Sequence, residues 1–207
     1  MAKSSFTHAS YYYGMPDMYM QMGYFPFPSQ RASEAAASNV LVPYAMSMSM
    51  QCSYYLGQTE KLDMSSGTQG YTALVNPVRS NMQLYINDWY VSNFSDRPVE
   101  MQLWFGQASA VTGAKTSTHI TSGFVQPSPC PASQGQIVYS SSGSSPLADG
   151  VIASTRILPP MTTISAEKNG RWILAPGTAM SFLFPQAERQ AGQVLSAIGW
   201  WEQPLFR

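Results

Sequence analysis

The sequence predicts an all-β fold, a jelly roll or β-sandwich of about eight to ten strands with an extended N-terminal arm. Apolar and polar residues alternate with a period of two in 82–86 and 99–105, as in strands that bury one face. Segments rich in proline, glycine and asparagine separate the short apolar runs after residue 45. Residues 1–39 show neither period, and their prolines interrupt any continuous helix.

The strand candidates follow one another through the rest of the chain. We expect strands in the runs 50–56, 71–75, 82–86, 89–94, 99–105, 137–139, 151–158, 171–174, 179–184 and 194–201. The dipeptide Asn169-Gly170 predicts a tight hairpin turn between two strands. Two segments rich in small polar residues, 107–136 and 140–150, are expected to be loops. No segment after residue 45 shows the 3.6-residue period of a helix.

The composition bounds the class of protein. The chain has 207 residues, and its 11 Lys and Arg residues balance its 11 Asp and Glu residues. Because net charge is zero and no basic run exists, a basic nucleic-acid-binding protein is excluded as a first interpretation. Only 11% of the residues are charged, against about 25% in ordinary globular domains. A surface with so little charge favours association.

The chain divides near residue 40 into an arm, residues 1–39, and a β-sandwich body, residues 40–207. The arm is rich in tyrosine, methionine and proline, which makes it costly to expose to water although it cannot fold alone. We expect it to dock on a neighbouring copy of the chain, and a mobile tail is the alternative. The expected anchors are the aromatic residues Tyr11, Tyr12, Tyr13, Tyr19, Tyr24, Phe25 and Phe27.

The ends and the cysteines bear on localisation. The N-terminus lacks the apolar run of a secretory signal, and no stretch of about 18 apolar residues could span a membrane. We therefore expect synthesis in the cytosol without export by the usual route. Cys52 and Cys130 are too far apart in sequence for a CxxC motif. They are either two unrelated thiols or a disulfide, within one subunit or between two, formed in an oxidising place.

The sequence offers no specific catalytic or metal-binding motif. His119 could form a triad on paper with Asp88 or Asp149 and one of many serines, but such a list has no specificity. Glu100 and Glu167 could serve as a glycosidase acid pair no better than any other two acids. The acids show no calcium-binding spacing, and nothing brings histidines and cysteines together for zinc. We expect no enzymatic activity, no cofactor and no metal.

The C-terminal segment predicts a docking surface. Trp200 and Trp201 are neighbours in a strand candidate, so their indoles face opposite sides of the sheet. One indole can fill the core, and the other must face water, a loop or a second subunit. Together with Leu205 and Phe206, the outward indole suggests a surface for docking.

Several short motifs carry a resemblance to a known family. They are, in order, YTALVNP at 71–77, LYI at 84–86, VSNFS at 91–95, RILPP at 156–160, ILAPG at 173–177 and GWWE at 199–202. Together they resemble an uncharacterised family of small β-rich proteins from spore-forming bacteria, over about residues 65–203. The resemblance implies a β-rich fold and no assigned enzymatic activity.

The architecture is also similar to the jelly-roll subunits of endospore appendages. Those subunits are made without a signal peptide and polymerise through an N-terminal extension that inserts into the next subunit. The present arm is longer, and it is rich in tyrosine and methionine rather than cysteine. The likeness implies a function outside the cell or on the spore surface, with a spore-surface anchor protein as a further partner.

Two functions from different classes follow from these features. The leading hypothesis is a structural subunit that self-assembles head to tail into a homopolymeric helical fibre or a surface layer, with the arm docked on the next copy. The alternative is a carbohydrate- or surface-binding module that uses exposed tryptophans and the loops 107–136 and 140–150.

Overall fold

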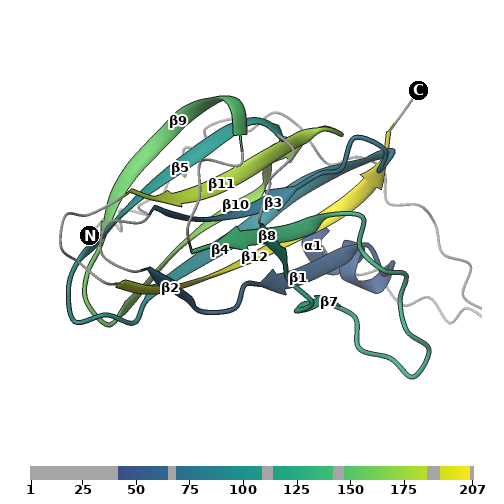
Figure 1. The fold of residues 1–207 in the computed structure, drawn as a ribbon. Coiled ribbons are helices and arrows are strands. Elements are labelled where there is room, and N and C mark those ends of the chain that lie inside the picture. The colour runs from purple at the N-terminus through teal and green to yellow at the C-terminus, as the bar shows by residue number, and fades with distance from the viewer. Residues whose placement is uncertain (1–41, 65–68, 109–113, 142–146, 186–191, 206–207) are drawn as a thin grey trace, which may run out of the picture. The chain divides into compact units, whose positions relative to one another are not determined.

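The computed structural model describes residues 42–64, 69–108, 114–141, 147–185 and 192–205 (Figure 1). These residues form a short helix, α1 (Tyr44–Met50), and antiparallel strands in two sheets. The strands are β1 (Tyr54–Gln58), β2 (Leu62–Met64), β3 (Gly70–Val75), β4 (Met82–Asn93), β5 (Val99–Ala108), β6 (Lys115–Thr116), β7 (Ile120–Ser122), β8 (Gln136–Ser140), β9 (Leu147–Leu158), β10 (Thr162–Leu174), β11 (Thr178–Phe184) and β12 (Gly192–Pro204).

The two sheets pack face to face as a β-sandwich, which confirms the predicted fold class. Sheet A has the order β10-β4-β12-β1-β7, with β2 also paired to β12, and sheet B has the order β6-β8-β3-β11-β5-β9. Within them, β10-β4-β12-β1 faces β9-β5-β11-β3, and the chain crosses between these two sets after β1, β3, β4, β9, β10 and β11. That winding of eight antiparallel strands is the jelly roll.

Strands β6, β7 and β8 form an insertion between β5 and β9. Strand β8 pairs with β3 at one side of sheet B, and β7 pairs with β1 at the same side of sheet A. The insertion therefore extends both sheets on the side of β1 and β3. The strands β9 and β10 border the sheets on the opposite side (Figure 1).

The main core lies between the sheets and follows the predicted alternation. In β4, the side chains of Leu84, Ile86, Trp89 and Val91 are buried between the sheets. Asn87 is an extra residue in the pairing of β4 with β12, so the inward-facing positions shift from even to odd residue numbers there. The Trp89 ring packs on Phe182 of β11 with ring centroids 5.1 Å apart. Burial of such large apolar side chains is the main source of stability for a sandwich.

Two predicted elements differ from the structure at the start of the body. The run 50–56 is not one strand, because α1 ends at Met50, a turn follows and β1 begins at Tyr54. Pro43 precedes the first turn of the helix, where its missing N–H costs nothing. A helix of seven residues spans two turns, which is too short to leave a readable 3.6-residue period. The short strands β2, β6 and β7 were also not expected.

The predicted hairpin turn at Asn169-Gly170 is wrong. Both residues have positive φ, 49° and 74°, as a tight turn requires, but they lie inside β10. Strand β10 pairs with β4 on both sides of them, and the register shifts between Glu167 and Trp172. The local turn chemistry thus produces a bulge that protrudes from one edge strand, because β4 is long enough to pair with both flanking segments.

Among the described residues, no helix is long and apolar enough to cross a lipid bilayer.

Candidate functional site

In the described part of the chain, the border formed by β9 and β10 has the longest edge strands. β9 has 12 residues and ends sheet B, whereas β10 has 13 residues and ends sheet A. The opposite borders end in β6 and β7, which have two and three residues. Long free edges offer unpaired backbone groups to another chain, and natural proteins usually shorten or cover them.

Strand β9 also exposes apolar side chains along this border. Val151 and Ile157 are 70% and 61% exposed, and Ile152 is exposed between them. Bulges interrupt its pairing with β5 near Trp104 and Phe105. An apolar, β-branched edge of this length is the usual template for strand addition. We call the outer sides of β9 and β10 the open edge.

The predicted arm anchors lie outside the described residues. They are Tyr11, Tyr12, Tyr13, Tyr19, Tyr24, Phe25 and Phe27.

The predicted C-terminal docking surface is not formed by the two indoles. Trp200 points into the inter-sheet core, and Trp201 is only 4% exposed on the outer face of sheet A. There Met48 of α1 packs against Trp201, and the ring of Tyr85 stacks on it with centroids 5.6 Å apart. The unexpected helix thus covers the outward indole. Leu205 remains partly exposed, and Phe206 lies outside the described residues.

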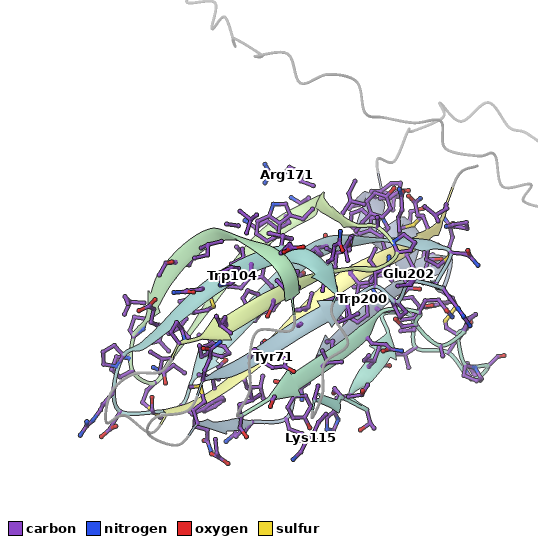
Figure 2. The ribbon with its side chains drawn as sticks, turned by 45° about the horizontal axis from the view of Figure 1, so that its top comes forward. Tyr71, Trp104, Lys115, Arg171, Trp200 and Glu202 are labelled. Carbon is purple, nitrogen blue, oxygen red and sulfur yellow. A yellow bond between two sulfur atoms is a disulfide. The ribbon has the colours of Figure 1, made fainter. Side chains whose placement is uncertain are left out.

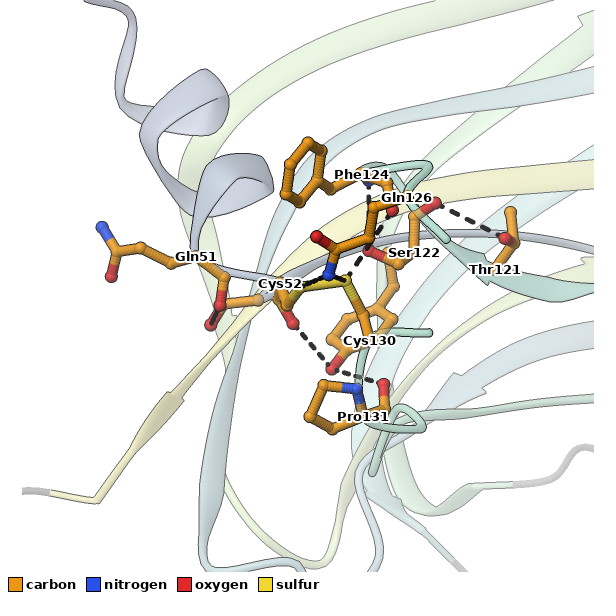
Figure 3. The surroundings of a disulfide bond; sticks show 10 residues. Gln51, Cys52, Thr121, Ser122, Phe124, Gln126, Cys130 and Pro131 are labelled. Carbon is orange, nitrogen blue, oxygen red and sulfur yellow. Dashed lines mark hydrogen bonds between the residues drawn. A yellow bond between two sulfur atoms is a disulfide. The ribbon is translucent and has the colours of Figure 1, made fainter. Parts of the chain in front are cut away.

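A disulfide joins Cys52 to Cys130 across 78 residues of sequence (Figure 3). Cys52 follows α1, and Cys130 lies in the inserted segment between β7 and β8. The Tyr55 hydroxyl lies 3.1 Å and 3.2 Å from the carbonyl oxygens of Cys52 and Pro131, next to the bond. The disulfide therefore ties the beginning of the body, where the arm enters, to the insertion.

Glu202 fixes the same insertion from the end of β12. Its carboxylate is 3% exposed and accepts hydrogen bonds from Ser133 Oγ, the N–H groups of Gln134 and Gly135, and Trp200 Nε1. Figure 2 shows Trp200 and Glu202 side by side at one end of the body. Hydrogen bonds to a buried charged group are about twice as strong as neutral ones. The sequence analysis did not single out this residue.

A shallow groove of about 440 Å³ lies on the outer face of sheet A. Ala197 and Gly199 of β12 form its floor, because their small side chains leave space above the sheet. Asp88 and the exposed Tyr90 ring border it from β4, and His119 lines it from the insertion. Apolar floor, aromatic ring and polar groups together are the usual lining of a small ligand site.

Two titratable groups at the groove, Asp88 and the neighbouring Tyr54, have a pKa above the usual value. Burial raises the pKa of the Asp88 carboxyl, against the stabilising effect of the amide of Asn87. Burial and the neighbouring Asp88 raise the pKa of Tyr54 to about 12. His119 Nε2 lies 2.6 Å from Glu60 Oε1 at the exposed rim. Sequence reasoning listed Asp88 and His119 for catalysis but gave no reason to place them in one groove.

Of the other acids considered for chemistry, Glu167 lies opposite Asp88 in the pairing of β10 with β4, and its charge raises the pKa of Asp88. Glu100 and Asp149 lie elsewhere. Glu100 contacts Gln102 on β5, and Asp149 lies at the start of β9. In the part of the chain that the structure describes, no three histidine, cysteine, aspartate or glutamate side chains are close enough to hold a metal ion.

The strand order of the described residues defines a jelly-roll protein whose long edge strands lie together at one border. The chain belongs to a family of unknown function, DUF6143, whose model matches residues 31–207. The match covers the whole body and the last residues of the predicted arm. Comparisons with curated proteins and with solved structures found no match.

Proposed function

We propose that this protein is a self-assembling structural subunit, in which the N-terminal arm of one copy adds as a strand to the open edge of the next. The observation that carries the proposal is the long, apolar strand β9, which pairs with β5 on one side and has no described strand as a neighbour on its other side. Backbone hydrogen bonds along such an edge give affinity, and alternate side chains give specificity.

The sequence of the arm supports the proposal from the other side of the contact. Residues 1–39 are rich in the aromatic and methionine side chains that bury well at interfaces. Between residue 41 and Tyr11, 30 residues could extend for roughly 100 Å. A body of 167 residues has a radius of gyration of roughly 15 Å, so the arm can reach a neighbouring copy.

The geometry of such a contact determines the kind of assembly. The arm and the open edge are different surfaces, so each copy donates to one neighbour and accepts from another. A head-to-tail contact whose rotation does not close produces a filament. The disulfide is consistent with function in an oxidising place outside the cell or on the spore surface. An anchor protein at the base of the filament would complete the arrangement.

Removal of the arm and blockage of the edge test the proposal separately. We expect purified full-length protein to scatter light as very large particles, and the chain without residues 2–38 to remain small. The double variant Val151→Lys with Ile157→Lys places two charges on β9 and is expected to prevent assembly in the full-length chain.

The matched control places the same charges elsewhere on the surface. Val78 and Val125 are 75% and 91% exposed in loops, and the double variant with lysine at both positions should assemble normally. Particles of unchanged size from the arm-deleted chain would refute the proposal. Assembly of the β9 double variant, with the arm still required, would refute the assigned edge.

A second function is favoured by one observation, the groove on sheet A. The exposed Tyr90 ring could stack on a sugar, and the carboxyl of Asp88 could accept its hydroxyl hydrogens. This function predicts a monomer that binds soluble oligosaccharides in titration calorimetry. Binding should be lost in Tyr90→Ala and kept in Tyr44→Ala, which alters an exposed tyrosine outside the groove. Absence of heat from a broad oligosaccharide panel would remove this alternative.

A further inference from the structure

Three cationic side chains gather at the open edge. Arg156 lies on β9, and Lys168 and Arg171 lie on the bulge of β10. Arg171 Nε donates a hydrogen bond to the carbonyl oxygen of Lys168 at 3.2 Å. Burial, followed by the charges of Arg156 and Arg171, lowers the pKa of Lys168, so both guanidinium groups lie near its ammonium group. We call Arg156, Lys168 and Arg171 the cationic cluster.

The cationic cluster lacks a compensating acid within the described residues. Ion pairs there join Arg97 to Asp96 and His119 to Glu60, and neither pair includes a member of the cluster. Glu167 precedes Lys168 in β10 but acts on the outer face of sheet A, where its charge raises the pKa of Asp88. Like charges without a counter-charge repel, and an anionic partner relieves that repulsion.

Two members of the cluster are positioned by core indoles. Lys168 Nζ lies 4.2 Å from the ring centroid of Trp172, and the Arg156 guanidinium lies 5.3 Å from that of Trp89. Both indoles pack in or against the inter-sheet core, and Trp89 is fully buried. Cation–π contacts of this kind hold the charged groups at the border between the two sheets. The cluster is therefore a fixed feature of the open edge.

The arm contains one acid that matches this cluster. Residues 4–30 include a single charged residue, Asp17, with aromatic and methionine residues on both sides. From residue 42, where the described body begins, 25 residues could extend for roughly 80 Å to Asp17. That length exceeds the width of a body of this size, so Asp17 can reach the open edge of another copy.

We propose that Asp17 of one copy pairs with the cationic cluster of the next copy and so sets the register of the added arm. The proposal rests on the proposed function, which requires the arm to add to the open edge. Strand pairing alone permits slippage, because a backbone ladder is nearly indifferent to a shift of two residues. One acid opposite three cations selects a single register.

Charge reversal and charge exchange test the pairing in the full-length chain. We expect Asp17→Lys to raise the protein concentration needed for assembly by about tenfold or more, and Arg156→Glu with Lys168→Glu to do the same. Combining the two sets of substitutions restores opposite charges and should recover most of the loss. Sedimentation of assembled protein over a concentration series measures each value.

Two control variants reverse a charge at another position, and two further measurements check that the cluster variant still folds. Glu34→Lys reverses an acid in the arm outside 4–30, and Lys115→Glu reverses a cation on β6, on the opposite side of the body from Arg171 (Figure 2). Both should leave assembly unchanged. Tryptophan fluorescence and the thermal midpoint should stay near those of the parent chain in the cluster variant, because Arg156 is exposed and Lys168 half-buried.

The outcomes distinguish this proposal from the proposed function. If removal of residues 2–38 abolishes assembly while Asp17→Lys does not affect it, the pairing is refuted and the function of the arm stands. If the exchanged charges fail to recover assembly, the pairing is refuted as well. If the arm-deleted chain assembles, both proposals fail. A monomeric parent chain destabilised by Asp17→Lys would mean that the arm folds onto its own edge, which also overturns the pairing between copies.

Discussion

Removal of the disulfide should cost the body a large part of its stability. The bond between Cys52 and Cys130 closes a loop with a sequence separation of 78 residues. In the chain-entropy relation, a loop of this length restricts the unfolded chain by about 15 cal/mol/K, or about 4.5 kcal/mol at 25 °C. A domain typically has about 5–15 kcal/mol in total, so the double variant Cys52→Ser with Cys130→Ser should be close to the limit of stable folding.

The assay is urea unfolding at low protein concentration, followed by tryptophan fluorescence with and without reductant. We expect the parent chain under reducing conditions to match the double variant, and the double variant itself to be insensitive to reductant. With a slope of about 2 kcal/mol/M for a body of this size, the midpoint should fall by about 2 M urea. A midpoint shift below about 0.3 M, or reductant sensitivity in the double variant, would refute the reasoning.

Three further predictions concern the parts of the body that surround Trp201, the insertion and Tyr54. A Cβ on Gly170 would overlap the Trp201 indole, and the φ of 74° strains any other residue, so Gly170→Ala should cost about 3 kcal/mol in urea unfolding. Gly177→Ala, at a φ of 81° and with a Cβ that would lie 3.3 Å from the exposed Val78 side chain, should cost only about 1–2 kcal/mol. Glu202→Gln loses one acceptor oxygen and the charge, and should cost about 2–3 kcal/mol in the free energy of unfolding. An unchanged urea midpoint would contradict a stabilising role for the hydrogen bonds that Glu202 accepts. Because the pKa of Tyr54 is raised from 10.0 to about 12, its contribution is complete below pH 10 and disappears as pH rises through 12. Tyr54→Phe should therefore flatten the alkaline loss of stability, and an identical pH profile would contradict this.

The parts of the fold that the sequence predicted are those decided by local pattern. The alternation in β4 and β5 depends only on near neighbours, and the structure contains both strands. The sequence did not predict the insertion strands β6 and β7, because strands of two and three residues are too short to show a period.

The errors arose where a distant part of the chain decided the outcome. Asn169-Gly170 has the dihedral angles of a turn, but pairing with β4 on both sides keeps it within β10. Trp201 faces outward from its sheet as expected, but α1, some 150 residues earlier in the sequence, covers it. A periodicity argument cannot detect either contact, because both depend on tertiary packing.

The local sequence pattern also could not predict the open edge. The run 151–158 reads as an ordinary strand, and only the strand order shows that it ends a sheet. The same order brings Arg156 close to Lys168, which lies beyond a connecting turn in the other sheet. The arm, by contrast, is identified from its composition, because tyrosine, methionine and proline are concentrated in residues 1–39.

The most direct test of strand addition is a cryo-electron microscopy reconstruction of assembled full-length protein. The account predicts a continuous extended segment, contributed by a neighbouring copy, that runs alongside β9 and places Asp17 next to Arg156. A reconstruction in which β9 borders only solvent, or in which the copies meet through other surfaces, would contradict it.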